Sequence, residues 1–475
     1  MRQVVLTIAI IMIILNMACA QDYQTFNANR IAYYGDQCQN IKCVRIDSTA
    51  SSSDSIYYPF TVMQEAEPGC FSPWVASWIG PRIIIRENGV NLFFNRNNDT
   101  ITIKTRAGLN EGWIAYYFED SSVIEASIVK HDTLKFLGLH DSVKTIAFQV
   151  YDKMRNPVDH DINNMTLQIS KSYGVVKTLN FFLFPDFEIY FPPDQLDEYE
   201  LAGLSNPKTG VQNITWFDVY DFQPGDELHI LYQTSAWCAG YSETDKSILK
   251  YIERVNYEDS IVYSYSVRQS VYKSLQDSSR FSYYEDTVKS VIQYNADFDK
   301  LPGEPVVTDY MAFSFYMTPS SKTNPRAVEV FFFNGDSCWF MPVIDGCINY
   351  ENYLKGLGGP YYNNFGSERN LVYYKKGETE LGVPLVITKV PNYESGSNIL
   401  VSPNPASGFI KINVDKSYSG KMQITLFNLY GSVVFKEDID NPEKLINIET
   451  LNRGVYFYRV TEKERVVYSG KLLIK

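Results

Sequence analysis

The chain has 475 residues, a formal net charge of −12 at pH 7, and a composition that is 45% hydrophobic and 15% aromatic. This apolar fraction is too high for a disordered chain, and the length suffices for two or three domains with cores of their own. The basic residues form no tract longer than a pair such as Lys375 and Lys376. The sequence therefore excludes the electrostatic surface by which proteins bind nucleic acid or anionic lipid.

Residues 1–20 have the parts of a secretory signal peptide. A positive charge at the second residue precedes the apolar run Val4–Leu15, and Ala18–Ala20 offers a cleavage site of the small-x-small type. The run is too short to span a bilayer, and no later run reaches that length, so we expect no transmembrane segment in the mature chain. Cys19 leaves a lipoprotein as an alternative, although Asn16 stands where a lipobox has leucine.

Six cysteines remain after the signal peptide. An even number of cysteines in an exported chain indicates disulfide bonds, although six cysteines allow 15 pairings. Short spacing favours two local pairs, Cys38 with Cys43 and Cys338 with Cys347. Cys70 and Cys238 then either pair over a long span or remain thiols.

The first body region, residues 21–185, is predicted to be a series of antiparallel strands. The 36 Tyr and 28 Phe of the chain favour pleated surfaces. Runs of apolar and β-branched residues alternate with turn formers such as Glu87–Gly89 and Asn95–Asp99. The strand-like runs include Ser55–Met63, Arg82–Arg96, Asp99–Ala107, Gly112–Asp120 and Lys144–Asp152.

The second body region, residues 186–390, has the same character. Its start lies in the proline-rich, acidic stretch Pro185–Gly210, which we interpret as a connection between the two regions. Ser247–Val255 fits a short helix or a strand, and the β-rich run beside it favours a strand. We expect a glycine-rich loop at Leu354–Gly366. Further strand-like runs are Glu227–Gln233, Ser260–Val267, Ala327–Asn334 and Arg369–Gly377.

Residues 391–398 are short and polar and are predicted to be a linker. The last part of the chain then alternates in polarity with a period of two, as Ile410, Lys411 and Ile412 illustrate. Seven short strands with turns between them predict a small β-sandwich. The expected strands are Ile399–Pro403, Phe409–Val414, Met422–Leu429, Ser432–Asp438, Leu445–Thr450, Val455–Glu462 and Val466–Lys475. The predicted fold class is all-β, with a large antiparallel body followed by this seven-stranded sandwich.

Residues 399–475 resemble the type A C-terminal sorting domain of the type IX secretion system. The residues that carry the resemblance are Pro403, Asn404, Pro405, Gly431, Leu451, Gly454, Val455, Tyr456 and Lys475. The resemblance implies passage through the periplasm and the outer membrane to the cell surface or medium. It also implies two partners, the outer-membrane secretion machinery and the enzyme that removes the sorting domain.

A search for catalytic and metal-binding patterns assigns no catalytic, metal-binding or cofactor-binding residue. The chain lacks the common hydrolase, phosphate-loop and zinc motifs, and three of its four histidines precede an aspartate in positions typical of turns. Glu227 and His229 are predicted to share one face of a strand, which suits a metal ligand pair or an acid and base. No third ligand is identifiable, and a half-exposed strand explains the pair equally well. Trp74 and Trp78 are the tryptophans that we expect to be exposed.

One motif recurs through the body: Asp followed by Ser or Thr and then a small or aliphatic residue. It resembles the O-glycosylation sequon of the bacterial group that carries this secretion system. The alternative is that Asp-Ser and Asp-Thr end turns before strands. The candidate acceptors are Ser48, Ser55, Thr100, Thr133, Ser142, Ser260 and Thr287.

The sequence therefore predicts an exported, all-β protein whose body binds, adheres or forms surface structure, with a glycan or another surface ligand as partner. The alternative is a secreted hydrolase that acts on polysaccharide or protein, because the two carboxylates of a glycosidase leave no reliable spacing in sequence.

Overall fold

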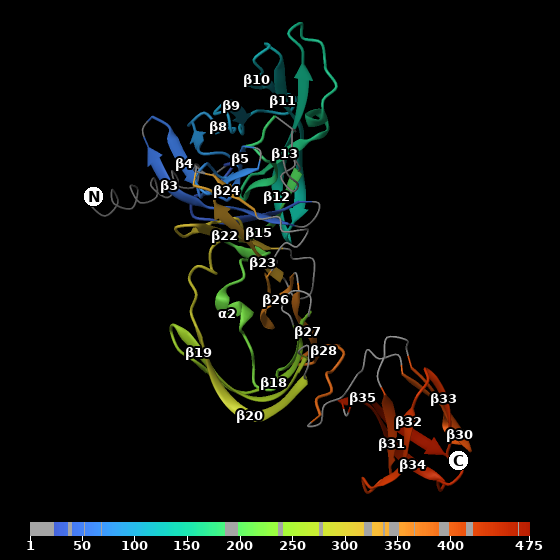
Figure 1. Ribbon diagram of the computed structural model, residues 1–475. Helices are drawn as coiled ribbons and strands as arrows, with labels where there is room; N and C mark the ends of the chain where they lie inside the picture. The colour runs from blue at the N-terminus through green and yellow to red at the C-terminus, as the bar shows by residue number, and fades with distance from the viewer. Residues whose placement is uncertain are drawn as a thin grey trace. The chain divides into compact units, whose positions relative to one another are not determined.

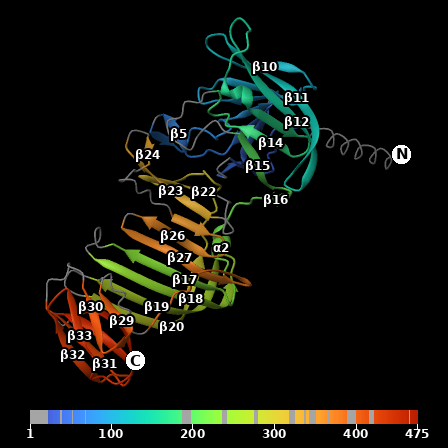
Figure 2. The same cartoon turned by 90° about the vertical axis from the view of Figure 1, so that its right-hand side faces the viewer.

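The computed structural model describes residues 23–36, 40–51, 53–67, 69–185, 198–235, 241–274, 279–317, 325–335, 338–341, 351–364, 366–388, 399–414, 421–463 and 465–475. The chain divides into two compact units, one that extends to Ile387 and one from Thr388 to Lys475. The all-β prediction is confirmed (Figures 1 and 2). The predicted linker 391–398 lies outside the described residues.

The first unit contains a nine-stranded antiparallel sheet in the order β10-β11-β12-β13-β14-β15-β1-β2, with β16 on β15. A short 3-10 helix, η1 (Asp161–Asn164), precedes β13. The strands are β1 (Ala32–Gly35), β2 (Ile41–Val44), β10 (Gly112–Tyr117), β11 (Val123–Phe136), β12 (Leu139–Tyr151), β13 (Thr166–Ser170), β14 (Gly174–Leu179), β15 (Glu198–Ser205) and β16 (Lys208–Gly210). The predicted connection Pro185–Gly210 is thus wrong over β15 and β16, because apolar residues such as Tyr199 and Leu201 of β15 alternate into the core.

A second sheet of the first unit has five strands in the order β3-β4-β7-β8-β9. Its members are β3 (Ile46–Ser51), β4 (Ser55–Pro59), β7 (Ile83–Ile85), β8 (Val90–Phe94) and β9 (Thr100–Lys104). Both predicted hairpin connections are confirmed: residues 87–89 join β7 to β8 and residues 95–99 join β8 to β9.

The third sheet of the first unit has 14 strands, with the main order β20-β19-β18-β17-β27-β26-β25-β23-β24-β6-β5. The one α-helix among the described residues, α2 (Trp216–Val219), lies just before β17. The strands are β5 (Gln64–Glu67), β6 (Cys70–Ser72), β17 (Glu227–Thr234), β18 (Ser242–Asn256), β19 (Ser260–Ser274), β20 (Ser279–Gln293), β21 (Val306–Val307), β22 (Met311–Met317), β23 (Pro325–Phe333), β24 (Trp339–Phe340), β25 (Glu351–Leu354), β26 (Gly358–Asn364), β27 (Ser367–Lys376) and β28 (Thr379–Gly382).

This sheet settles two expectations. Ser247–Val255 is a strand, as favoured, because it forms part of β18. The glycine-rich loop at Leu354–Gly366 is wrong over β26, which pairs with β25 and β27. The sheet also joins the two expected body regions, since β5 and β6 come from the first and the other strands from the second. The division of the body at 185/186 stays a prediction.

The main core of the first unit forms where aromatic side chains from distant strands meet. Trp78 is only 1% exposed, and its indole N–H donates to the carbonyl of Cys43 at 2.7 Å. Its ring lies edge-on to Tyr34 and tilted against Tyr199, with centroids 5.6 and 5.1 Å away. The expectation that Trp78 is exposed is therefore wrong, whereas Trp74 is 67% exposed as expected.

The second unit is a seven-stranded arrangement in the order β32-β31-β34-β35-β29-β30-β33. The residues of β30, β31, β34 and β35 that alternate inward share one core. The seven predicted strands correspond to β29 (Leu400–Ser407), β30 (Phe409–Asn413), β31 (Met422–Phe427), β32 (Val433–Ile439), β33 (Glu443–Asn447), β34 (Gly454–Glu462) and β35 (Arg465–Ile474).

Candidate functional site

The Pro403-Asn404-Pro405 segment attaches β29 to the last strand of the chain. Both prolines follow cis peptide bonds, and neither has an N–H to donate. The side chain of Asn404 supplies the pairing instead: its Nδ2 donates to the carbonyl of Lys471 at 2.6 Å, and its Oδ1 accepts from the N–H of Leu473 at 2.9 Å. One asparagine thus replaces the backbone pairing that two prolines remove.

The end of the chain closes on the same segment. The N–H of Lys475 donates to the carbonyl of Ala406 at 2.9 Å, and Ala406 is the parallel register partner of Ile474. This is the one parallel pairing of named strands among the described residues. It fixes Lys475 against β29, the first strand of the sandwich.

Two further segments of the resemblance form tight turns. Gly431 has a φ of +79°, which favours glycine, in the β31–β32 turn, where Oδ1 of Asn428 accepts two backbone N–H groups. Leu451 packs against the core before β34 begins at Gly454. The half-buried Val455 is paired with Leu473, and the buried Tyr456 donates its hydroxyl to the carbonyl of Asn452 at 2.8 Å.

The body contains a second candidate site on its longest strands. β18, β19 and β20 each have 15 residues and bend around the side on which α2 lies (Figure 1). On this side Leu228 of β17 and its register partner Leu249 pack into a core with Phe222. Because side chains alternate along a strand, Tyr232 and Asp245 lie on the same side, four residues farther from that core.

Rows of register partners define what we name the inner polar face. One row crosses five strands and holds Tyr362, Arg369, Tyr232, Asp245 and Val271. The two neighbouring rows add Ser247 with Gln269, and Glu243 with Lys273. All nine side chains are half-buried. Polar groups of this face are therefore partly withdrawn from water and still reachable from it.

The acids of the inner polar face have partners within it. Gln269 Nε2 donates to one oxygen of Asp245 at 2.7 Å, and the Ser247 hydroxyl donates to the other at 3.0 Å. Burial raises the pKa of Asp245, and these two hydrogen bonds oppose that rise. Glu243 is paired with Lys273 at 3.2 Å, and the Lys273 ammonium lies 3.7 Å from the centroid of the Tyr241 ring.

Arg369 differs from its charged neighbours, because it makes no hydrogen bond or ion pair with any residue that the structure describes. Its charge acts on nearby tyrosines: burial raises the pKa of Tyr220 to about 12 and raises that of Tyr361, while Arg369 lowers both. The two hydroxyls donate to backbone carbonyls, Tyr220 to Gly359 at 2.9 Å and Tyr361 to Leu357 at 2.6 Å. Within the described part of the chain, the guanidinium therefore has no hydrogen-bond or ion-pair partner, although its charge also acts on Asp245 and opposes the rise in the pKa of that carboxyl.

Comparison with known proteins identifies the second unit. Residues 400–475 match the family described as the secretion system C-terminal sorting domain. The chain is a cargo protein of the type IX secretion system. The sorting domain implies interaction with the secretion machinery and export through the outer membrane, as the resemblance of residues 399–475 predicted.

Other comparisons say less about the cargo protein. Two solved structures of one extracellular domain from B. thetaiotaomicron, named as part of a one-component and of a hybrid two-component system, align at 8% identity. The alignments cover 96% of this chain and 98% of those chains, with TM-scores of 0.13 and 0.14. Scores of this size establish no shared fold. A search of curated proteins gave no match.

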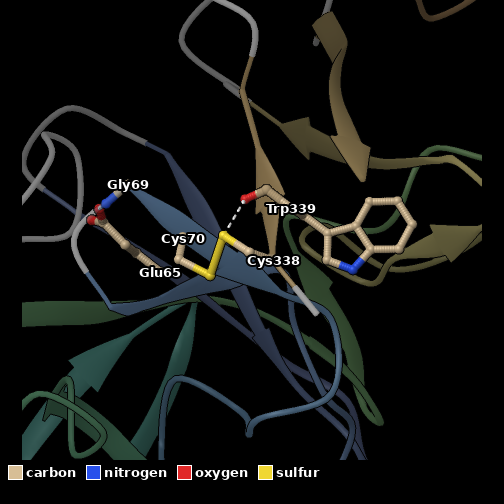
Figure 3. The surroundings of a disulfide bond; sticks show 5 residues. All are labelled: Glu65, Gly69, Cys70, Cys338 and Trp339. Carbon is tan, nitrogen blue, oxygen red and sulfur yellow. Dashed lines mark hydrogen bonds between the residues drawn. A yellow bond between two sulfur atoms is a disulfide. The ribbon is translucent and has the colours of Figure 1, made fainter. Parts of the chain in front are cut away.

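The disulfide pairing of the cargo protein differs from the expected one. Cys338 is bonded to Cys70, 268 residues away, with Cα atoms 5.2 Å apart (Figure 3). The bond joins Cys70 of β6 to the residue just before β24, and these two strands are neighbours in the sheet. The predicted pair of Cys338 with Cys347 is therefore wrong, because the pairing of β6 with β24 places Cys70 within bonding distance of Cys338. The predicted pair of Cys38 with Cys43 is also wrong, since Cys43 is a buried free thiol.

Cys43 lies in surroundings that disfavour thiol chemistry. It is 0% exposed and burial raises the pKa of its thiol, so the reactive thiolate is disfavoured. Cys38, Cys238 and Cys347 lie outside the described residues.

Glu227 and His229 lie together as predicted, with Nε2 of His229 2.8 Å from Oε1 of Glu227. The N–H of Leu385 donates to Nδ1 at 2.8 Å, so the ring carries its proton on Nε2 and donates it to the carboxylate. Both ring nitrogens are occupied, which leaves none for a metal or a substrate. Among the described residues, no three His, Cys, Asp or Glu side chains are grouped closely enough to hold a metal ion.

The candidate glycosylation sites all lie on strands, with different exposure. Ser55, Thr100 and Ser260 are the first residues of β4, β9 and β19, which agrees with an Asp that ends a turn. Ser260 is buried, and the Ser142 hydroxyl accepts a hydrogen bond from Tyr23 at 2.9 Å. The exposed candidates are Ser48, Thr100, Thr133 and Thr287, and Ser55 and Ser142 are half-buried. Modification stays a prediction.

Sequence reasoning missed the inner polar face. The spacing of Glu243, Asp245 and Ser247 does show that the three share one side of a strand. Their meeting with Gln269 and Arg369 depends on which strands pair and in which register, and no local pattern encodes that.

No helix in the described parts of the chain is long and apolar enough to cross a membrane.

Proposed function

We propose that the body of this cargo protein is a binding module for a glycan outside the outer membrane. The observation that carries the proposal is the inner polar face, where fixed hydrogen-bonding groups adjoin tyrosine rings. A sugar ring offers hydroxyls to groups such as Asp245 and Gln269 and an apolar face to rings such as Tyr232 and Tyr362. The bend of β18–β20 gives this side of the sheet its inward curve (Figure 1).

A glycan array with the mature chain tests the proposal. The double variant Tyr232→Ala, Gln269→Ala removes one ring and one donor from the inner polar face, and it should lose the binding that the natural chain shows. Tyr283→Ala is the matched control, because Tyr283 lies on β20 in a row of partners that faces the other side of the sheet. Equal loss in the control, or retention in the double variant, would place binding elsewhere.

A hydrolase is the second candidate function, and one observation favours it. Glu243 and Asp245 share one side of β18, and burial raises the pKa of Asp245, as in a carboxyl group that acts as general acid. A screen of polysaccharide and protein substrates separates the two functions. If the natural chain hydrolyses a substrate and Asp245→Asn abolishes this activity, the body is a hydrolase. If the natural chain binds a glycan without hydrolysing it, the body is a binding module.

For the route, we propose that the processing enzyme of the secretion system removes the sorting domain after export and that the body is attached to the surface or released. The mature fragment is expected to end between Pro391 and Asn398. Intact mass measurement of the exported protein tests this, and an exported chain that still ends at Lys475 would refute removal.

A further inference from the structure

We propose that the inner polar face selects glycans that carry carboxylate groups, and that Arg369 binds the carboxylate. The inference rests on the proposed glycan-binding function and adds the chemical class of the ligand. A uronic acid is the sugar of this class, because its carboxylate is attached directly to the ring.

The first step of the argument is the distribution of charge on the face. Glu243 is neutralised by Lys273 at 3.2 Å, and Asp245 accepts two hydrogen bonds from Gln269 and Ser247. Within the described residues, Arg369 is the charged group of this face that has no such partner. A half-buried guanidinium without a partner is incompletely solvated, so a ligand anion that pairs with it replaces lost water contacts.

The second step is the placement of aromatic rings around that charge. Arg369 is the register partner of Tyr232 on one side and of Tyr362 on the other. Opposite residues in such pairs have Cβ atoms about 5 Å apart, close to the width of a sugar ring. A ring that stacks on either tyrosine therefore holds an attached carboxylate within reach of the guanidinium fork, which matches two carboxylate oxygens at once.

The third step is selection against the wrong ligand. The chain carries a net charge of −12, so a polyanion gains nothing from the overall field and needs a specific cation. A neutral sugar would leave Arg369 without a partner and would displace its water, which costs binding free energy. The face thus favours an acidic sugar over a neutral sugar of the same shape.

Calorimetry with the mature full-length chain and matched galacturonan oligomers tests the inference. The probes are the free acid, its methyl ester and a sulfated galactan. The proteins are the natural chain, Arg369→Gln, Arg369→Lys and the control Arg268→Gln. Arg268 is exposed on β19 in a row that faces the other side of the sheet.

The free acid is expected to bind at least about tenfold more tightly than the ester, since a charged hydrogen-bonded pair contributes that much or more. Arg369→Gln should abolish the preference, Arg369→Lys should keep part of it, and Arg268→Gln should leave it unchanged. Equal affinity for acid and ester, or a preference that survives in Arg369→Gln, overturns the inference but not glycan binding. Tighter binding of the sulfated galactan than of the acid overturns the choice of carboxylate. Binding of no glycan on the array refutes the proposed function itself.

Discussion

Arg326 lies fully buried between the rings of Phe298 and Phe315, with its guanidinium carbon 4.7 and 4.4 Å from their centroids. Its guanidinium donates to the carbonyls of Ile214 and Lys300, the first at 2.8 Å. Burial lowers its pKa to about 10, so the side chain stays charged at neutral pH. One residue of β23 therefore holds two loop segments and two aromatic rings together.

Replacing this residue should be costly. Arg326→Leu leaves buried carbonyls without donors, and we expect the free energy of unfolding of the body to fall by about 2–5 kcal/mol. Urea unfolding followed by tryptophan fluorescence measures this, since every tryptophan of the chain precedes residue 388. Arg280→Leu at an exposed position of β20 is the control and should change stability by less than about 0.5 kcal/mol. A similarly small change in unfolding free energy for Arg326→Leu would contradict the claim that Arg326 holds these segments together.

Asp245 gives stability a defined pH dependence. Burial raises its pKa in the folded chain above the value of 3.8 for an unperturbed carboxyl, so the folded state holds this proton more tightly than the unfolded chain does. This contribution to stability is fully present below the unfolded value of 3.8 and is lost as the pH rises through the folded pKa.

Asp245→Asn removes this contribution. Relative to the natural chain, the variant should gain unfolding free energy as the pH is raised from about 4 to about 7. Urea unfolding at several pH values measures the difference, with the exposed Asp309→Asn as control. If the difference in unfolding free energy between the variant and the natural chain does not change with pH, the pKa of Asp245 is not raised by folding.

The elements of the body are held by a bond that spans most of its sequence. The Cys70–Cys338 disulfide joins β6 to the start of β24 across 268 residues, and closing so long a loop restricts the unfolded chain. The double variant Cys70→Ser, Cys338→Ser should lower the unfolding free energy of the body by about 2–5 kcal/mol. Chemical reduction of the natural chain should have the same effect and should leave the double variant unaffected. If the double variant and the reduced natural chain are both as stable as the oxidised natural chain, the strand pairing alone stabilises this part of the body.

In the sorting domain, the side chain of Asn404 adds two hydrogen bonds to the backbone pairing of β29 with β35. Asn404→Ala removes two hydrogen bonds to β35, and amide exchange in Lys471–Ile474 should accelerate about tenfold. Hydrogen-exchange mass spectrometry of the natural chain, Asn404→Ala and the control Asn452→Ala measures this effect. Exchange that is as slow in Asn404→Ala as in the control would assign the attachment to the backbone alone.

The same elements show which features sequence can predict. Residues such as Ile410 and Ile412 alternate cleanly, because each strand of the sorting domain has one buried and one exposed side, so its seven strands were predictable. β26 was missed because Gly358 and Gly359 suggest a loop, although neighbouring strands pair with this segment. The Cys70–Cys338 bond and the surroundings of Arg369 were not predictable, since both arise from the register of strands that are far apart in sequence.

At the scale of the whole molecule, the cargo protein consists of two compact units. Residues 400–475 carry the sorting domain, whereas the inner polar face lies entirely on strands of the body. Each unit has a hydrophobic core of its own, so changes in the body should leave export intact, and changes in the sorting domain should leave ligand binding intact.

Deletion of residues 399–475 tests the central claim, that the second unit directs export. Cells that produce the full chain or the truncated chain are separated into periplasm, outer membrane with surface, and medium, and the body is detected in each fraction with one antibody. The full chain is expected at the surface or in the medium, and the truncated chain should accumulate in the periplasm. Delivery of the truncated chain to the surface or medium in undiminished amount would contradict the claim.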